Sequence, residues 1–310
     1  MKGEWRFNTK KEIEDVYSPF ILVLFELFSK LMFRKIPLIA LFLGLLSGLR
    51  AQDVEFGVNT FATSYLGELN NSLNWASNIR YGSGFHVRRN INPWWSVRSD
   101  ANWAMIAGSD NRENRISNYR NLSFRSAVFE ITALAEYRIR PITIFPSRHR
   151  MTPYVAAGFH LFHFDPQAKY KGEWYDLAPL SLEGQGLAEY PDRKPYSLAQ
   201  IGVPVAIGMR WASRQNLRIA LEAGYRFTFT DYLDDVGGFY ANPAVVAANK
   251  GAIAGALADR RSELNTAQSF LEPAEAGSFR GSPRWNDGYV FVGLSFSYVR
   301  FRSTCPVIAP

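Results

Sequence analysis

The sequence predicts an all-β protein: an eight-stranded antiparallel transmembrane β-barrel with short periplasmic turns and long outer loops. Aromatic residues make up 15% of the 310 residues and charged residues only 20%, which excludes an intrinsically disordered chain. Apolar and polar residues alternate with a period of two through stretches that are long for the strands of soluble proteins. The connections between these stretches alternate between short and long, as they do in outer-membrane barrels.

Bulk composition excludes several other classes of protein. The mean hydropathy of −0.15 excludes a bundle of membrane helices, because such sequences are strongly apolar. A single cysteine excludes a disulfide scaffold and a cysteine-built zinc or iron–sulfur site. The formal net charge of +7 is not gathered into a block of lysine and arginine, so the sequence gives no case for nucleic acid binding.

Residues 1–51 have the features of a targeting segment, and the barrel domain is predicted to span residues 52–310. Arg34 and Lys35 precede the apolar run Ile36–Leu46, and small residues lead to Ala51. This order describes a secretory signal peptide that is cleaved after Ala51. Because Met32 stands where such a signal should begin, residues 1–31 are predicted to be an overcalled extension. The alternative is an uncleaved membrane anchor.

The predicted strands follow one another along the barrel domain. In the fourth, Phe129 and Ile131 share one face while Glu130 and Glu136 share the other; the first strand is the least regular. A tilted strand needs about 9–11 residues to cross a bilayer, and a sheet in lipid must close so that its backbone groups are paired. The eight stretches are Val54–Tyr65, Ser77–Arg89, Trp94–Gly108, Leu122–Arg138, Thr152–Phe164, Ser197–Trp211, Leu217–Thr230 and Asp287–Arg302.

The connections set the predicted orientation of the barrel. Short or moderate connections follow strands two, four and six: Asn90–Pro93, Ile139–Met151 and Ala212–Asn216. Longer ones follow strands one, three, five and seven: Leu66–Ala76, Ser109–Asn121, Asp165–Tyr196 and Asp231–Asn286. Because outer-membrane barrels have short periplasmic turns, both termini should lie in the periplasm. Within the last long loop, Pro243–Ala267 is alanine-rich with helical spacing and predicts a small surface helix or a mobile insertion.

The two faces of the strands predict two environments. The polar face mixes arginine with glutamate and aspartate, as a narrow lumen filled by paired side chains requires. Aromatic residues near the strand ends predict an interfacial girdle. They are Tyr65, Trp75, Trp94, Trp95, Tyr137, Tyr154, Phe164, Trp211, Phe229, Tyr232, Trp285 and Tyr289. The alternative is a soluble β-sandwich whose rings fill its core.

No catalytic, cofactor or metal site is predicted. His160 and His163 are three residues apart on one strand and so point to opposite faces. The sequence contains no Gly-x-Ser-x-Gly motif, although a site assembled from different strands stays open. Asp231, Asp234 and Asp235 could hold calcium, but their spacing favours a capped turn. Cys305 lies in the tail, either as a free thiol or as a link to a periplasmic partner.

Four motifs occur in an order that resembles one known family. They are Gly172–Gly186, Gly202–Gly208, Thr230–Val236 and Cys305-Pro306. Together they resemble the PorG-like outer-membrane barrels of Bacteroidetes, which are associated with the type IX secretion system. The resemblance runs from Gln52 to Pro306. The motif residues carried over to this sequence are Glu183, Gly184, Gln185, Gly186, Asp231, Asp234 and Asp235.

The resemblance implies a non-enzymatic role in the cell outer membrane. PorG-like barrels are thought to anchor a periplasmic ring of PorK-like lipoprotein and PorN-like subunits, which supports protein export and, in some species, gliding motility. The periplasmic turns and the tail carrying Cys305 are then expected to contact the ring. The middle turn carries a basic cluster suited to an acidic partner or lipid headgroups: Arg140, Arg148, His149 and Arg150. The alternative is a lipid-modifying enzyme or small-molecule carrier on the same barrel.

Overall fold

The computed structural model describes residues 54–70, 78–110, 120–140, 151–212, 216–264, 272–282 and 286–300. The predicted signal peptide, the basic-turn residues Arg148, His149 and Arg150, and the tail residue Cys305 lie outside these residues. The strands are β1 (Val54–Leu66), β2 (Arg80–Asn90), β3 (Trp95–Ser109), β4 (Ser123–Arg138), β5 (Met151–Tyr170), β6 (Glu173–Asp176), β7 (Ala199–Ala212), β8 (Leu217–Thr228) and β9 (Gly288–Arg300).

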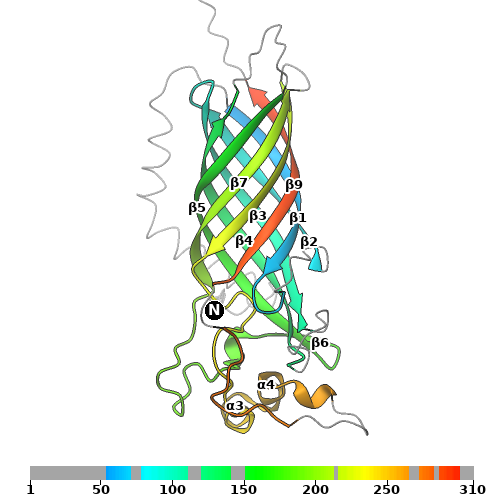
Figure 1. Cartoon of the computed structure of the whole chain (residues 1–310), viewed down its shortest axis with the longest axis vertical. Coiled ribbons are helices and arrows are strands. Elements are labelled where there is room, and N and C mark those ends of the chain that lie inside the picture. Colours follow the sequence, from blue (N-terminus) through cyan, green and yellow to red (C-terminus); the bar gives the residue numbers. More distant parts are fainter. Residues whose placement is uncertain are drawn as a thin grey trace, which may run out of the picture. The chain divides into compact units, whose positions relative to one another are not determined.

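Eight of these strands close into the predicted antiparallel barrel (Figure 1). Neighbouring strands pair in chain order, β1 pairs with β9, and β4 pairs with β5. Closure gives each barrel strand two partners, which is the condition for crossing lipid without unpaired backbone. The strand bounds agree with the predicted stretches except at β5, which runs on to Tyr170 and pairs there with the short strand β6.

The outward face of the barrel is apolar. Large apolar side chains point outward from all eight barrel strands, and Phe85, Phe159 and Ile207 are 71%, 77% and 66% exposed. Soluble proteins rarely expose apolar patches of this extent. Buried arginine, glutamate, aspartate and asparagine side chains occupy the opposite face of the same strands. This inside-out arrangement is that of a transmembrane β-barrel, and it excludes the sandwich with an apolar core.

Two kinds of packing fill the lumen. Ion pairs fill its middle and its short-turn end, the end at which β2 joins β3 and β7 joins β8. The opposite, long-loop end is filled by apolar side chains, an arrangement that the alternation did not predict. That cluster includes Tyr65, Ile106, Phe124, Phe162, Phe164 and Tyr289 from the strands and Leu233 and Val236 from a loop. An eight-stranded barrel is wide enough only for side chains, and here they occupy its width.

The girdle prediction is correct for Trp94, Trp95 and Tyr137 at the short-turn end and wrong for four other residues, of which Tyr154 also lies at that end. Trp94 and Trp95 lie exposed beside Tyr137, with ring centroids 6.4 and 5.0 Å from its ring. The other four rings, at most 1% exposed, face the lumen because they stand on the inward side of the alternation. They are Tyr65, Tyr154, Phe164 and Tyr289.

The long-loop end carries a folded unit that we call the cap: residues 171–198 and the described residues between 229 and 287. It contains β6, α3 (Pro243–Lys250) and α4 (Ala252–Ala258), at the lower end of Figure 1. The predicted helical insertion is therefore two short helices. Val246 and Leu257 pack into a separate apolar core with Leu177, Leu182 and Leu187. Among the described residues, no helix is long and apolar enough to cross a membrane.

Candidate functional site

The cap brings the seven family-motif residues together over the long-loop mouth. Glu183 links its two halves: its Oε1 accepts hydrogen bonds from the backbone N–H groups of Gly237 and Gly238, both at 3.2 Å. The same oxygen accepts from Nη1 of Arg280 at 3.1 Å, and both side chains are buried. A buried carboxylate that meets a guanidinium and two amides is well stabilised. Glu183 therefore fastens the loop after β6 to the loop after β8.

Backbone shape explains the glycines beside Glu183. Gly184 has φ +81°, and a Cβ on it would lie 2.4 Å from the Tyr190 ring. Gly186 has φ +73°. Both positions need the left-handed conformation that only glycine adopts without strain. The Gln185 side chain accepts a hydrogen bond from the Glu183 N–H at 3.1 Å, which completes the turn.

Asp234 fastens the cap to the barrel, and Asp235 holds two parts of the cap together. The hydroxyl of Tyr65, at the end of β1, donates to Asp234 at 2.7 Å. The Tyr196 hydroxyl donates to Asp235 at 2.6 Å, and Arg280 Nη1 lies 3.8 Å from the same carboxylate. Asp235 itself has φ +62°, which Asp tolerates in tight turns. The Asp234 carboxylate also accepts a hydrogen bond from the Val236 N–H at 2.9 Å, so the predicted capped turn is present.

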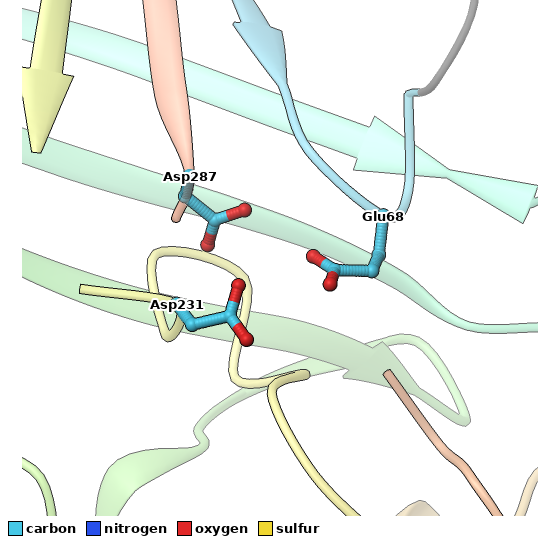
Figure 2. A group of neighbouring side chains, drawn as sticks. All are labelled: Glu68, Asp231 and Asp287. Carbon is cyan, nitrogen blue, oxygen red and sulfur yellow. The ribbon is translucent and has the colours of Figure 1, made fainter. Parts of the chain in front are cut away.

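A second acidic group lies beside this turn and gathers residues from three distant segments (Figure 2). The carboxylates of Glu68, Asp231 and Asp287 point toward one another, and one oxygen from each lies within 4.8 Å of the others. This oxygen-only donor set is of the kind that Ca²⁺ prefers. Asp287 accepts a hydrogen bond from the Leu233 N–H and shares the Tyr65 hydroxyl with Asp234. Sequence reasoning found Asp231 but missed Glu68 and Asp287, because the pattern along the chain does not show that the three meet.

Burial and mutual repulsion favour protonated carboxyl groups in this cluster. Burial, together with the negative charges of Glu68 and Asp234, raises the pKa of Asp231 to about 9. Burial raises the pKa of Asp287 well above its usual value, and neighbouring Asp234 and Glu68 add to the effect. Burial also raises the pKa of Glu68. At neutral pH the cluster therefore retains protons that the unfolded chain would release.

We expect the stability of the protein to fall as pH rises from about 4 to about 9. Asp231 binds its proton more tightly in the folded protein than in the unfolded chain. Stability is therefore lost as the pH rises from the ordinary pKa of this group, 3.8, to its pKa in the folded protein, about 9. Asp231→Asn keeps the shape and removes this titration. Its thermal midpoint, measured against wild type across this pH range, should rise relative to wild type as pH increases. If the difference in thermal midpoint between Asp231→Asn and wild type does not change with pH, the prediction is wrong. Flattening of the wild-type profile by millimolar calcium would show that a cation neutralises the cluster instead.

The lumen contains a serine–histidine–asparagine chain assembled from three strands. His86 lies 2.9 Å from the Ser297 hydroxyl and 2.8 Å from the Asn59 side-chain oxygen. Arg88 also donates to Ser297, at 3.5 Å. His86 is 2% exposed and Ser297 is 3% exposed, so both side chains are buried in the described lumen.

The remaining predicted residues lie at other positions. His160 faces the lumen and His163 faces outward, as their spacing predicted. Arg140 is exposed at the short-turn end just beyond β4, far along the strand from the cap. Whether it contacts a partner stays a prediction.

Comparison with known families and structures gives one family match. A family model described as "Domain of unknown function (DUF6089)" matches residues 34–243. A search of curated proteins found no match.

Several solved outer-membrane barrels are similar in structure. Ail, the attachment invasion locus protein of Yersinia pestis, is 8% identical, with 81% of this chain and 99% of that chain covered and a TM-score of 0.37. Neisserial surface protein A is 10% identical, with 79% and 96% covered and a TM-score of 0.36. OprG from Pseudomonas aeruginosa is 9% identical, with 82% and 99% covered and a TM-score of 0.33.

Proposed function

We propose that this chain, which belongs to the family described as Domain of unknown function (DUF6089), anchors a periplasmic ring complex to the outer membrane. The machinery is a type IX protein secretion system, which in some species also drives gliding motility. The partners are a PorK-like lipoprotein and a PorN-like subunit. This part of the proposal, the outer-membrane location and the partners, is based on the resemblance of the four sequence motifs to those of the PorG-like barrels.

The observation that carries this proposal is the filled and capped lumen of a barrel whose outer surface is apolar. The ion pairs of Arg88, Arg98 and Arg226 occupy the described lumen. Beyond them, the apolar cluster that includes Tyr65 fills the long-loop end of the lumen, and the cap covers this end. A barrel filled in this way is a poor conduit for a folded protein, whereas a rigid barrel fixed in lipid suits an anchor.

The short-turn end is the proposed docking face. Short turns of outer-membrane barrels face the periplasm, and β1 begins and β9 ends there. Arg140 is exposed at this end, and the sequence places Arg148, His149 and Arg150 in the same turn. Basic side chains on the turn suit an acidic surface of a ring subunit, because complementary charge selects a partner and speeds encounter.

Charge reversal of the basic turn is expected to release the ring proteins. Replacing Arg140, Arg148 and Arg150 with glutamate should lower their co-purification with the barrel about tenfold or more, since like charges across an interface cost several kcal/mol. The matched control reverses three exposed lysines at the opposite end: Lys169, Lys171 and Lys194. Equal recovery of the ring proteins with both variants would show that the basic turn is not the docking face. Failure of wild-type protein to retain them would overturn the anchoring role.

A further inference from the structure

Arg125 lies on the lipid-facing side of the barrel wall. It points outward from β4 with Phe129, because side chains alternate along a strand and Val128 and Glu130 face the lumen. Between Arg125 and Phe129 the outward face of β4 carries only Ala127. The lipid-facing surface of this strand therefore continues without interruption as far as Arg125.

The depth of Arg125 in the membrane follows from strand geometry. Tyr137 marks the headgroup layer at the short-turn end, where it contacts the exposed rings of Trp94 and Trp95. Arg125 stands twelve positions before Tyr137 on β4, a distance of about 40 Å along a strand. At a strand tilt of about 35–45° this distance crosses about 30 Å of membrane, which is the thickness of the hydrocarbon core. Arg125 therefore lies where the headgroups of the opposite leaflet begin.

An aromatic ring and an amide hold the Arg125 side chain in place. Arg125 pairs with Gln167 on β5, and β5 pairs in turn with β6, which carries Trp174. The guanidinium carbon of Arg125 lies 3.6 Å from the centre of the Trp174 ring, and its Nε donates to the Gln167 side-chain oxygen at 3.0 Å. Trp174 is 42% exposed, as a ring in the headgroup layer would be. Three strands therefore fix one guanidinium group at this depth before any ligand binds.

The terminal nitrogens of Arg125 are available to a ligand outside the barrel. Among the described residues they have no hydrogen-bond partner, and no carboxylate forms an ion pair with Arg125. Two carboxylates share the outward face of the hairpin, Asp165 and Asp176, and Asp176 accepts from Nε2 of Gln167 at 2.6 Å. Lipid phosphates and water both surround the barrel at headgroup depth. A guanidinium group binds phosphate through two parallel hydrogen bonds between charged groups, which are about twice as strong as bonds to a neutral acceptor such as water.

We propose that Arg125, held on the Trp174 ring, binds the phosphate of a lipid headgroup in the outer leaflet. The long loops of an outer-membrane barrel face the outside of the cell, so the leaflet at Arg125 is the outer one. The occupant is a lipid rather than a soluble phosphate, because Ala127 and Phe129 continue the lipid-facing surface directly from Arg125 and contact the acyl chains of the same molecule. This inference rests on the membrane-spanning barrel alone and does not depend on the ring proteins.

Thermal unfolding of the purified protein in dodecyl maltoside micelles provides the test. The micelles receive increasing amounts of phosphatidic acid or of diacylglycerol with the same acyl chains, so that the two lipids differ by the phosphate alone. Saturable stabilisation of wild type by phosphatidic acid, and less by diacylglycerol, is expected. Arg125→Gln should weaken the apparent affinity for phosphatidic acid about tenfold, because the charged donors are lost. Arg300→Gln is the matched control, since Arg300 is exposed on the last position of β9, at the short-turn end, and stacks on no described ring.

A second variant keeps the test decisive if Arg125→Gln does not fold. Trp174→Leu retains the Arg125 charge but removes the ring beneath it, and a loss of affinity of about two- to fivefold is expected from a cation–π contact at an exposed site. Unchanged affinity in a folded Arg125→Gln or Trp174→Leu variant would overturn the proposal. Equal losses in Arg125→Gln and Arg300→Gln would do the same, because any cation at the rim would then attract the lipid. Inorganic phosphate that stabilises wild type as well as phosphatidic acid does would show that the ligand is not a lipid.

Discussion

Glu136→Gln is expected to destabilise the barrel by about 3–5 kcal/mol, because removing one partner of a buried ion network leaves the other charges uncompensated. The Glu136 carboxylate accepts from Arg88, Arg98 and Arg210, and also from the Ser96 hydroxyl at 2.9 Å. Glutamine keeps the size of the side chain and loses its charge. Three buried guanidinium groups would then compete for the remaining carboxylates. Guanidinium-induced unfolding in phospholipid vesicles, followed by tryptophan fluorescence, measures the change.

The control for this measurement is Glu173→Gln in the cap. Glu173 is exposed on β6 and accepts one hydrogen bond, from the Tyr175 hydroxyl at 2.7 Å. Its replacement should change the unfolding free energy by no more than about 0.5 kcal/mol. The contrary result is that Glu136→Gln changes the unfolding free energy as little as this control does. Such a result would show that water screens the lumen charges and that the ion pairs of the lumen do not stabilise the barrel.

Residues of β4 show why so much of the barrel could be predicted. Side chains alternate between the two faces of a strand, so the spacing of Phe129, Glu130 and Ile131 assigns each to a face from local sequence alone. The structure places Glu130 in the lumen and the other two outside. Closure follows from the same pattern, since an apolar outer surface needs lipid and lipid does not tolerate an open sheet edge.

Long-range pairing could not be predicted in this way. Arg98 meets Glu222 across the lumen at 2.6 Å, although 124 positions separate them in the sequence. Which charges meet depends on the register with which the sheet closes, and alternation does not fix that register. Glu68, Asp231 and Asp287 illustrate the same limit at the long-loop end, where the loop after β1 meets both ends of the loop between β8 and β9. Tyr65 was assigned to the girdle because of its place at a strand end, yet it stands on the inward face and binds Asp234.

The extension of β5 had a local signal that the prediction missed. Lys171 and Gly172 have φ values of +48° and +96° and join β5 to β6. Two consecutive residues with positive φ make the tight turn that β-hairpins favour, and glycine is common in it. Arg125 stacks on Trp174 of this hairpin, with 3.6 Å from its guanidinium carbon to the ring centre. The hairpin therefore continues the wall of the barrel into the cap.

An arginine in place of Ile131 is expected to cost about 2–4 kcal/mol of stability in a bilayer, since a cation at the middle of the lipid face loses its hydration. Ile131 is 53% exposed and lies midway along the outer face of β4, between Arg125 and Tyr137. If that face contacted water, the same change would be nearly neutral, because an exposed position on a soluble sheet accepts arginine. The measurement therefore separates a lipid-facing barrel from a water-facing one.

Ile139→Arg supplies the matched comparison for Ile131→Arg. Ile139 is 52% exposed, follows β4 directly and lies past Tyr137, where the lipid face meets the headgroups. Because the penalty for arginine falls to about 0–1 kcal/mol near the interface, Ile139→Arg should unfold almost as wild type does in vesicles. In a micelle the difference between the two variants should shrink, since detergent thins around a charge more easily than a bilayer does. Equal unfolding free energies for both variants in vesicles would show that depth does not matter at these positions, and the apolar face would then need a covering other than lipid.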